Sequence, residues 1–269
     1  MKRYALLVLL AVILAAVALT GCTMPGGVDK SWDKVSEKGE LVMGLDDSFP
    51  PMGFRDENNE IAGFDVDLAK EVCARLGISL VLQPINWDTK EQELNTGKID
   101  CIWNGFTITE ERKENILFSK PYMNNRQVLV VNAASPIEKL SDLQGKKLAL
   151  QASSSASVAL DASGDFKSGL KEVVEFDNNM TALMDLEKGG VDAVLMDEIV
   201  ANYNIQTKNA NVKVLEEALA AEEYGIGFRK ADNALMTKVQ ETLEAMAKDG
   251  KLAEISDKWF GKDLSTVGK

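Results

Sequence analysis

Two segments of the sequence resemble each other at a spacing of 92 residues. The segments are ELNTGKIDCIWNG and DLEKGGVDAVLMD, and their equivalent positions are Ile99 and Val191. Each has the end of a helical pattern, a glycine that can stop the helix, and Ile or Val followed by Asp at the start of an apolar strand. The repeat predicts two lobes of similar design, each with a mostly parallel sheet covered by helices. A helix-to-strand turn shared by chance is the alternative.

The segment before the first repeat has the pattern of a β-α-β unit. The apolar run at residues 41–45 predicts a strand, and two consecutive prolines soon after it exclude a helix. Residues 63–77 have apolar positions at helical spacing, with Asp65 as the expected N-cap and Gly77 as the expected stop. An alternating strand over residues 78–83 completes the unit.

The last part of the chain returns to the first lobe. The 269 residues exceed one typical domain, and the segment AEEYGIGFRK predicts a new strand followed by a helical pattern up to the C-terminal end. We therefore expect the chain to cross between the lobes twice, near residues 121–128 and 221–226. The predicted lobe 1 is discontinuous, with residues 39–125 and 223–269, and the predicted lobe 2 is the insertion of residues 126–222.

The N-terminus has the pattern of an export signal over residues 1–21. Lys2 and Arg3 precede an uncharged apolar run, and the run closes with LTGC at Cys22. A permanent membrane-spanning helix is the alternative, but fifteen apolar residues would rise only about 22 Å, against a hydrocarbon core of about 30 Å. LTGC resembles a bacterial lipobox, which implies an acylated Cys22 and a lipid-anchored, extracytoplasmic protein. Residues 22–38 are then expected to be the acylated cysteine and a tether.

Composition excludes several classes of function. The net charge is −12, and no basic segment interleaved with aromatic residues is present, so we expect no nucleic-acid partner. The sequence contains no histidine, which excludes a Ser-His-Asp triad and any metal site with a histidine ligand. The cysteines at 22, 73 and 101 lack the close spacing of zinc or redox motifs, so no metal and no cofactor are expected. Cys73 and Cys101 are expected to be buried free thiols, and a disulfide between them is the alternative.

Seven motifs in order resemble the extracellular solute-binding proteins of family 3, the polar amino-acid receptors of bacterial ABC importers. They are DDSFPPM, GFDVDLAKE, GKID, GFTITEER, FSKPY, VDAVLMD and YGIGFRK, and the resemblance covers roughly residues 41–261. It implies an α/β fold, the two-lobed periplasmic-binding-protein fold of type II. Each lobe would have a mixed, mostly parallel sheet flanked by helices, and two crossing strands would join the lobes.

Arg112, in the motif GFTITEER, is the candidate site residue with an independent physical reason. With Thr109 as N-cap, Arg112 lies in the first turn of a helix, where a positive side chain opposes the helix dipole and calls for an anion nearby. The resemblance implies a bidentate pair between Arg112 and the α-carboxylate of the ligand, with the Gly105 carbonyl and the Thr107 hydroxyl meeting its α-amino and carboxylate groups. A solvated surface arginine is the alternative.

Lobe 2 is expected to supply the opposite side of the site. The resemblance implies that Asp197, at the end of VDAVLMD, binds the α-ammonium group, and a simple helix N-cap is the alternative. Ser154 and Ser155 stand where a strand enters a helix and are expected to donate to the carboxylate. The sequence has Ala152-Ser153-Ser154-Ser155 here instead of the Gly-Thr-Thr type of loop usual in the family, so a plain serine-rich loop stays open as an alternative.

The side chain of the ligand is expected to meet a further set of residues. This set is Asp46, Phe49, Trp87, Trp103, Gln151 and Met196. Phe49 and Trp87 resemble the aromatic walls of the family, while Trp103 is equally expected in the core. An acid at position 46 disfavours aspartate and glutamate by like-charge repulsion, which favours polar neutral ligands such as glutamine or cystine, or basic amino acids.

The resemblance therefore implies a monomeric receptor that binds an L-amino acid between its lobes and delivers it to the permease of an ABC importer. Such a protein makes and breaks no bonds. The alternatives are a periplasmic cyclohexadienyl or arogenate dehydratase on the same fold, with Glu223 as the only extra acid near the cleft, and a ligand-sensing module.

Overall fold

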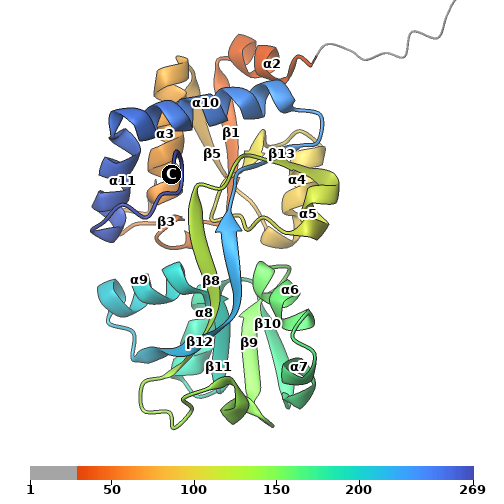
Figure 1. Cartoon of the computed structure of the whole chain (residues 1–269), viewed down its shortest axis with the longest axis vertical. Coiled ribbons are helices and arrows are strands. Elements are labelled where there is room, and N and C mark those ends of the chain that lie inside the picture. Colours follow the sequence, from red (N-terminus) through yellow and green to blue (C-terminus); the bar gives the residue numbers. More distant parts are fainter. Residues whose placement is uncertain (1–28) are drawn as a thin grey trace, which may run out of the picture.

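The structure, a computed structural model, describes residues 29–269 and contains two lobes, each built on a five-stranded sheet (Figure 1). In lobe 1 the strand order is β5 (Ser79–Pro84), β1 (Glu40–Leu45), β6 (Cys101–Ile102), β13 (Gly227–Arg229) and β7 (Ile116–Phe118). In lobe 2 it is β10 (Glu172–Phe176), β9 (Lys147–Gln151), β11 (Ala193–Asp197), β8 (Met123–Asn132) and β12 (Val212–Tyr224). Each sheet is parallel on one side, and strands from the returning or crossing segments pair antiparallel on the other. This is the type II periplasmic-binding-protein architecture that the sequence predicts.

Helices flank both sheets, and a small sheet lies on the cleft side of lobe 1 (Figure 1). The helices of lobe 1 are α2 (Ser31–Lys38), α3 (Phe64–Leu76), α4 (Lys90–Asn95), α5 (Glu110–Asn115), α10 (Asn233–Asp249) and α11 (Lys251–Phe260). Those of lobe 2 are α6 (Ser155–Asp161), α7 (Asp165–Gly169), α8 (Asn179–Glu187) and α9 (Glu198–Lys208). The small sheet has the strands β2 (Ser48–Phe49), β3 (Gly53–Arg55) and β4 (Ile61–Ala62), and the 3₁₀ turns are η1 (Trp87–Thr89) and η2 (Leu140–Leu143).

The two lobes are joined by β8 and β12, which form one antiparallel pair (Figure 1). Their register runs from Val212 opposite Asn132 to Tyr224 opposite Met123, with irregularities between Val214 and Ala220. Both crossings therefore lie side by side, as a hinge of two strands requires. The residue boundaries given above for lobes 1 and 2 remain a prediction.

The repeat in the sequence has the same local geometry in both lobes. The carboxylate of Asp100, before β6, accepts a hydrogen bond from the Val42 N–H at 3.0 Å. The carboxylate of Asp192, before β11, accepts one from the Lys147 N–H at 2.8 Å. In each lobe an aspartate thus ties a central strand to its parallel neighbour, at positions 92 residues apart. A helix-to-strand turn shared by chance does not explain this match.

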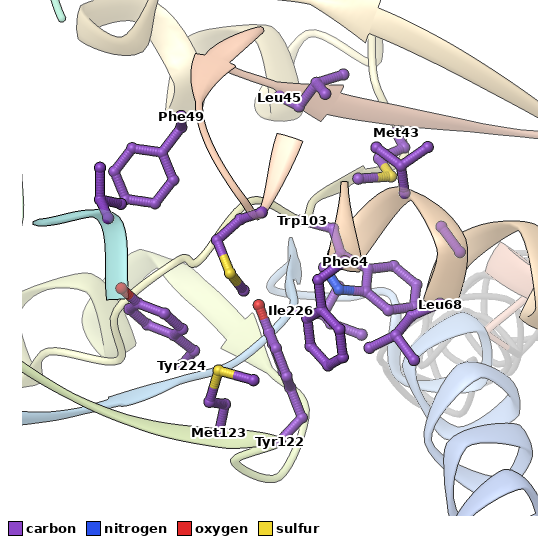
Figure 2. Close-up of a cluster of buried hydrophobic side chains, with 14 of the residues drawn as sticks. Met43, Leu45, Phe49, Phe64, Leu68, Trp103, Tyr122, Met123, Tyr224 and Ile226 are labelled. Carbon is purple, nitrogen blue, oxygen red and sulfur yellow. The ribbon is translucent and has the colours of Figure 1, made fainter. Parts of the chain in front are cut away.

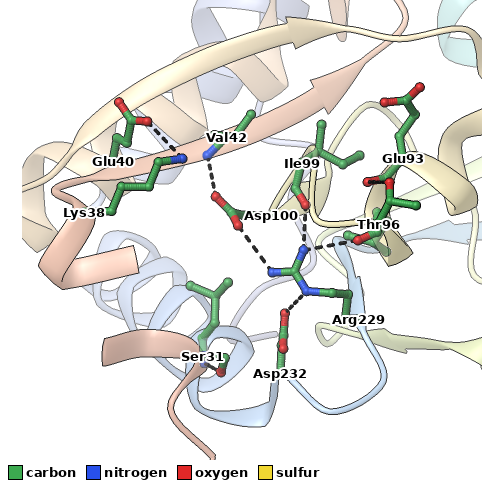
Figure 3. A network of polar contacts seen from close by, with 12 residues as sticks. Ser31, Lys38, Glu40, Val42, Glu93, Thr96, Ile99, Asp100, Arg229 and Asp232 are labelled. Carbon is green, nitrogen blue, oxygen red and sulfur yellow. Dashed lines mark hydrogen bonds and ion pairs between the residues drawn. The ribbon is translucent and has the colours of Figure 1, made fainter. Parts of the chain in front are cut away.

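Arg229 joins the returning part of the chain to the first part of lobe 1 (Figure 3). From the end of β13 its guanidinium donates to the Ile99 carbonyl at 2.6 Å, and it forms ion pairs with Asp100 and Asp232 at 3.3 and 2.6 Å. Arg229 therefore holds the turn that carries the repeat at Ile99 and Asp100. These contacts stabilise a lobe whose two parts are far apart in the sequence.

The N-terminal side of α3 differs from the prediction. The helix begins at Phe64, and Gly63, with φ +146°, occupies the N-cap position; Asp65 lies inside the first turn and does not cap. A Cβ atom at Gly63 would come within 2.2 Å of the Met52 carbonyl oxygen, so only glycine fits. Asp65 is free for another role, which is described with the site below. Gly77 ends the helix in the left-handed conformation, as expected.

The predicted tether of residues 22–38 is wrong at its C-terminal end. Residues 31–38 are the helix α2, and the Ser31 hydroxyl accepts from the Leu235 N–H at 3.0 Å, while the Asp29 carboxylate accepts from the Ala234 N–H at 2.6 Å. These bonds satisfy backbone donors at the start of α10 and fix α2 on lobe 1. The side chain of Val35, on the same helix, is buried in the hydrophobic core.

The predicted signal segment and the acylated Cys22 lie outside the described residues. Within residues 29–269, no helix has the length and apolar character needed to cross a membrane. Cys73 and Cys101 are both buried free thiols in the structure, and burial raises the pKa of Cys73 to about 12.

Candidate functional site

A small cavity lies between the lobes, and side chains of both lobes line it. Its lining residues are Asp46, Phe49, Trp87, Asn104, Gly105, Thr107 and Arg112 from lobe 1, and Gln151, Ser154, Ser155 and Asp197 from lobe 2. Ten of the eleven residues predicted to bind ligand are therefore brought together. Their roles in binding remain predictions, and the geometry below bears on each.

Arg112 is a buried cation at the wall of this cavity. The Thr109 hydroxyl caps α5 by accepting from the Arg112 N–H at 3.1 Å, which places Arg112 in the first turn. The guanidinium, 7% exposed, donates to the Thr107 carbonyl at 2.8 Å and lies 4.4 Å from the ring centre of Phe106. Burial lowers its pKa to about 10. Among residues 29–269 no carboxylate lies within 4.0 Å of it, so the site can accept an external anion.

Asp197 is the buried anion on the other side of the cavity. It stands at the N-cap position of α9, but its side chain makes no capping bond. Instead its carboxylate accepts from the Tyr224 hydroxyl at 2.6 Å and from the Asn125 amide at 2.7 Å. Desolvation, and then the charge of Glu222, raise its pKa to about 7. A buried carboxylate without a cationic partner among the described residues is suited to an ammonium group.

The serine loop contributes hydroxyl groups from lobe 2. The Ser155 hydroxyl lies 3.1 Å from the Thr107 hydroxyl of lobe 1 and accepts from the Gln127 amide at 3.2 Å. The Ser154 hydroxyl is buried at the cavity and has no hydrogen-bond partner within residues 29–269. An unpaired buried hydroxyl is costly unless another molecule satisfies it, which favours a donor role over a plain loop.

The far end of the cavity joins the lobes through Asp46 and Gln151. The Gln151 amide donates to the Asp46 carboxylate at 2.8 Å and to the Asp177 carbonyl at 3.0 Å. Desolvation raises the pKa of Asp46. Asn104, which the sequence analysis missed, accepts from the Asp46 N–H at 3.1 Å and also lines the cavity. The end of the cavity is thus polar and acidic.

Gly105 makes the closest approach of backbone to the site. Its φ is +54°, and a Cβ atom there would meet the ring of Phe49 at 2.8 Å, so glycine is required. Its N–H donates to the Asp65 carboxylate at 2.7 Å, and the same carboxylate oxygen accepts from the Tyr122 hydroxyl at 2.9 Å. Desolvation raises the pKa of Asp65 to about 7. Asp65 therefore fixes the peptide that faces the cavity.

Of the aromatic and apolar residues predicted to meet the ligand side chain, some line the cavity and others lie in the core. Phe49 and Trp87 line the cavity, but Trp103 is fully buried in the core of lobe 1 (Figure 2). Met196 does not line the cavity either, which counts against its predicted role. Successive side chains of a strand point to opposite faces, and next to Asp197 on β11 Met196 belongs to the core that also includes Val200 of α9.

The acid nearest the site at the crossing is Glu222. Its carboxylate accepts from the amides of Asn125 and Gln127 at 2.9 and 3.0 Å and from the Thr107 hydroxyl at 3.1 Å. Glu223, the acid nominated for an enzyme, is exposed and lines a surface groove instead. Successive side chains of β12 point to opposite faces, so only one of the two neighbouring glutamates can face the site. The sequence did not reveal which one.

Among the described residues no group of three or more Cys, Asp and Glu is placed to hold a metal ion. The arrangement supports binding of a small molecule that carries an anionic and a cationic group, with a polar end beyond them. Fold and site together thus define a two-lobed binding protein with its site between the lobes. The chain belongs to the bacterial extracellular solute-binding proteins, family 3, whose family model matches residues 41–262. Its place is therefore extracytoplasmic.

Several similar proteins have a named ligand. The L-cystine-binding protein TcyJ of Escherichia coli K12 is 31% identical over 262 residues, which cover 94% of this chain and 95% of TcyJ. A Streptococcus pneumoniae ABC uptake transporter substrate-binding protein, solved with bound histidine, is 40% identical with a TM-score of 0.86 and covers 88% of this chain and 98% of its own. Tv2483, solved with L-arginine, is 36% identical with a TM-score of 0.84 and covers 90% and 98%.

One further solved structure bears on the enzyme alternative. The ancestral amino acid-binding protein AncCDT-1, a precursor of cyclohexadienyl dehydratase, is 33% identical with a TM-score of 0.77 and covers 85% of this chain and 98% of its own. TcyJ and the Streptococcus pneumoniae protein are binding proteins as well.

Proposed function

We propose that this protein is the substrate-binding lipoprotein of an ABC importer, which binds one L-amino acid between its lobes and delivers it to the membrane permease. The observation that carries the proposal is the pair of Arg112 and Asp197, a buried cation and a buried anion on opposite lobes of one cavity. An α-amino acid carries the complementary carboxylate and ammonium groups. A ligand that engages both lobes favours the closed form.

In this proposal Arg112 pairs with the ligand carboxylate, since a planar guanidinium can donate two parallel hydrogen bonds. The hydroxyls of Thr107, Ser154 and Ser155 lie on the same cavity, and each adds a donor for the carboxylate; Thr107 does so by turning its proton away from Glu222. Asp197 accepts from the α-ammonium group, together with the carbonyl of Gly105. Each group named here lines the cavity.

The ligand side chain extends toward Asp46 and Gln151 between the rings of Phe49 and Trp87. A carboxylate at this end repels an acidic side chain and favours a polar neutral or basic one. The related receptors bind cystine, histidine and arginine, and these ligands agree with that preference.

Further parts of the proposal concern the whole protein. It acts as a monomer without a cofactor, with lobe 1 formed by residues 39–125 and 223–269, extended at its start by α2, and lobe 2 by residues 126–222. An acylated Cys22 anchors it to the membrane. We further propose that it is not an enzyme; the exposed position of Glu223 counts against the acid nominated for that alternative.

Titration calorimetry tests the proposal with the protein from residue 23 onward, refolded to remove carried-over ligand. L-arginine, L-histidine, L-glutamine and L-cystine are the probes. We expect at least one to bind, and Arg112→Ala to weaken its binding by about 2 to 5 kcal/mol, roughly thirtyfold or more, because a desolvated ion pair is lost.

Arg75→Ala is the matched control, because Arg75 pairs with Glu71 and Asp249 on the surface of lobe 1. This variant should bind as the wild type does. If Arg112→Ala binds within about threefold of the wild type, the role assigned to Arg112 is wrong.

A further inference from the structure

Lys90 is an unusually buried lysine beside the cleft, and it belongs neither to the cavity lining nor to an ion pair within residues 29–269. It is the first residue of α4 and is only 5% exposed. Lysine side chains are almost never fully buried without a partner, because desolvation of the ammonium group is unfavourable. Desolvation, and next the nearby charge of Arg112, lower the pKa of Lys90 to about 8. Some interaction must therefore hold this group in place.

The partners of Lys90 are two backbone carbonyls, one on each lobe. Its ammonium group donates to the Trp87 carbonyl of lobe 1 at 3.0 Å and to the Ser153 carbonyl of lobe 2 at 2.9 Å. It also lies 5.1 Å from the centre of the Trp87 ring. The bond to Ser153 can exist only while the lobes are together.

Ser153 has a backbone conformation that supports this contact. Its φ is +52°, a left-handed value that residues other than glycine rarely adopt. The next residue, Ser154, lines the ligand cavity. The carbonyl that accepts from Lys90 thus belongs to the peptide bond between Ser153 and Ser154, directly before a residue of the cavity.

Lys90 differs in one respect from the other polar contacts across the cleft. Gln151 with Asp46, and Thr107 with Ser155 and Glu222, are contacts between side chains, and at least one partner of each lines the cavity. Lys90 lines a neighbouring groove and meets only main chain on the far lobe. Its contribution to closure is therefore independent of the ligand side chain.

We propose that Lys90 is a positioning residue that latches lobe 2 onto lobe 1 and thereby slows ligand release. The inference rests on the proposed function, because it concerns closure around a bound amino acid. A ligand shifts the balance between open and closed forms by its differential contacts with the two forms. The bond from Lys90 to Ser153 stabilises the closed form by the same amount for every ligand.

The test compares Lys90→Met with the wild type by stopped-flow measurement of dissociation. The probes are those of L-arginine, L-histidine, L-glutamine and L-cystine that the wild type binds. Methionine keeps the length of the side chain but donates no hydrogen bond. We expect dissociation about tenfold faster or more, by a similar factor for each bound probe, because a charge-assisted hydrogen bond of the closed form is lost.

Lys98→Met is the matched control, because Lys98 forms an exposed pair with Glu93 on the same segment and should leave dissociation unchanged. The melting temperature without ligand gives a second readout. A latch leaves it near that of the wild type, since the open form lacks the bond, whereas a merely structural lysine would lower it. Unchanged dissociation of the Lys90→Met variant would overturn the proposal, whether or not its melting temperature falls. Failure of the wild type to bind any probe would overturn the proposed function instead.

Discussion

Two carboxyl groups at the site, Asp65 and Asp197, have pKa values raised to about 7 by desolvation. They differ in their surroundings. Asp65 is enclosed by protein donors, with one carboxylate oxygen unpaired, while Asp197 lines the ligand cavity. The first therefore affects stability and the second affects binding.

Ligand affinity should rise with pH up to about 7. An ammonium group binds the ionised form of Asp197, so below its pKa binding must displace a proton, and Kd should fall by up to about tenfold per pH unit before it levels off. Calorimetry from about pH 5 to 8 measures this dependence. Glu222→Gln removes a charge that raises the pKa of Asp197, so the pH at which the affinity levels off should be lower in this variant. A flat profile in the wild type would contradict the assignment.

Asp65 should make the protein less stable as pH rises from about 4 to about 7. Its pKa is higher in the folded than in the unfolded state, so the folded state binds more protons in this window and loses stability through it. In Asp65→Asn this contribution is absent. The difference in free energy of unfolding between wild type and variant should therefore shrink with rising pH, as urea unfolding at both ends of the window can measure. A constant difference would argue against a raised pKa.

At the residue scale, motif positions were predictable and strand phase was not. Arg112 follows from a helix start that the sequence marks and from the family resemblance, and Asp197 follows from the resemblance. Met196 and Glu223 were each assigned one position away from the side chain that faces the site. A shift of one residue in a strand reverses its faces, and neither β11 nor β12 has a polar alternation that fixes the phase.

At the element scale, the C-terminal tail lies against the crossing segment. The Thr266 N–H donates to the Tyr122 carbonyl at 2.9 Å, its hydroxyl donates to the Pro121 carbonyl at 3.1 Å, and Ser265 forms a bridge with Met123 at the start of β8. The tail thus contacts one crossing through a single β-bridge and two hydrogen bonds.

Deletion of residues 263–269 should loosen this crossing without removing any residue of the cavity. We expect faster amide hydrogen exchange at residues 122–124 and a lower melting temperature, because the tail no longer holds the carbonyls of Pro121 and Tyr122 and the segment opens more often. Thr266→Ala is the matched variant, which loses only the hydroxyl bond and should have a smaller effect. Exchange rates unchanged by the deletion would show that the tail merely rests on the surface.

Elements with strong helical or strand patterns were predictable, and their ends were not. The helix at residues 63–77 was placed well, but its start depends on Gly63 and its contact with Met52, which no local pattern reveals. The helix α2 was missed because its eight residues bury only Ser31 and Val35 and depend on packing against α10. Tertiary contacts decide such short elements.

At the scale of the whole molecule, ligand binding should bring the lobes together. Small-angle X-ray scattering should show a smaller radius of gyration when a bound amino acid, such as L-arginine, is added to the wild type, and no change for Arg112→Ala. Agmatine, which keeps the cationic end of arginine but lacks the carboxylate, is the ligand control and should not close the lobes. Equal compaction by agmatine would place the driving contact elsewhere.

The two-lobed fold was predictable because several motifs in order and an internal repeat point to the same architecture. The contacts between the lobes were not predictable, since Lys90 with Ser153 and Gln151 with Asp46 join residues that are far apart in the sequence. Such pairs depend on how closed the cleft is, which no local pattern encodes.

The chain enters and leaves lobe 2 at neighbouring places, since Arg126 lies opposite Ala221 on the paired crossing strands. It is in effect a cassette with two adjacent junctions. Recombination at these junctions could replace Gln151 and Asp197 in a single event while Arg112 stays behind. Receptors of this design could therefore inherit the two halves of a recognition site from different ancestors, with the lobe 1 groups kept and the lobe 2 groups renewed.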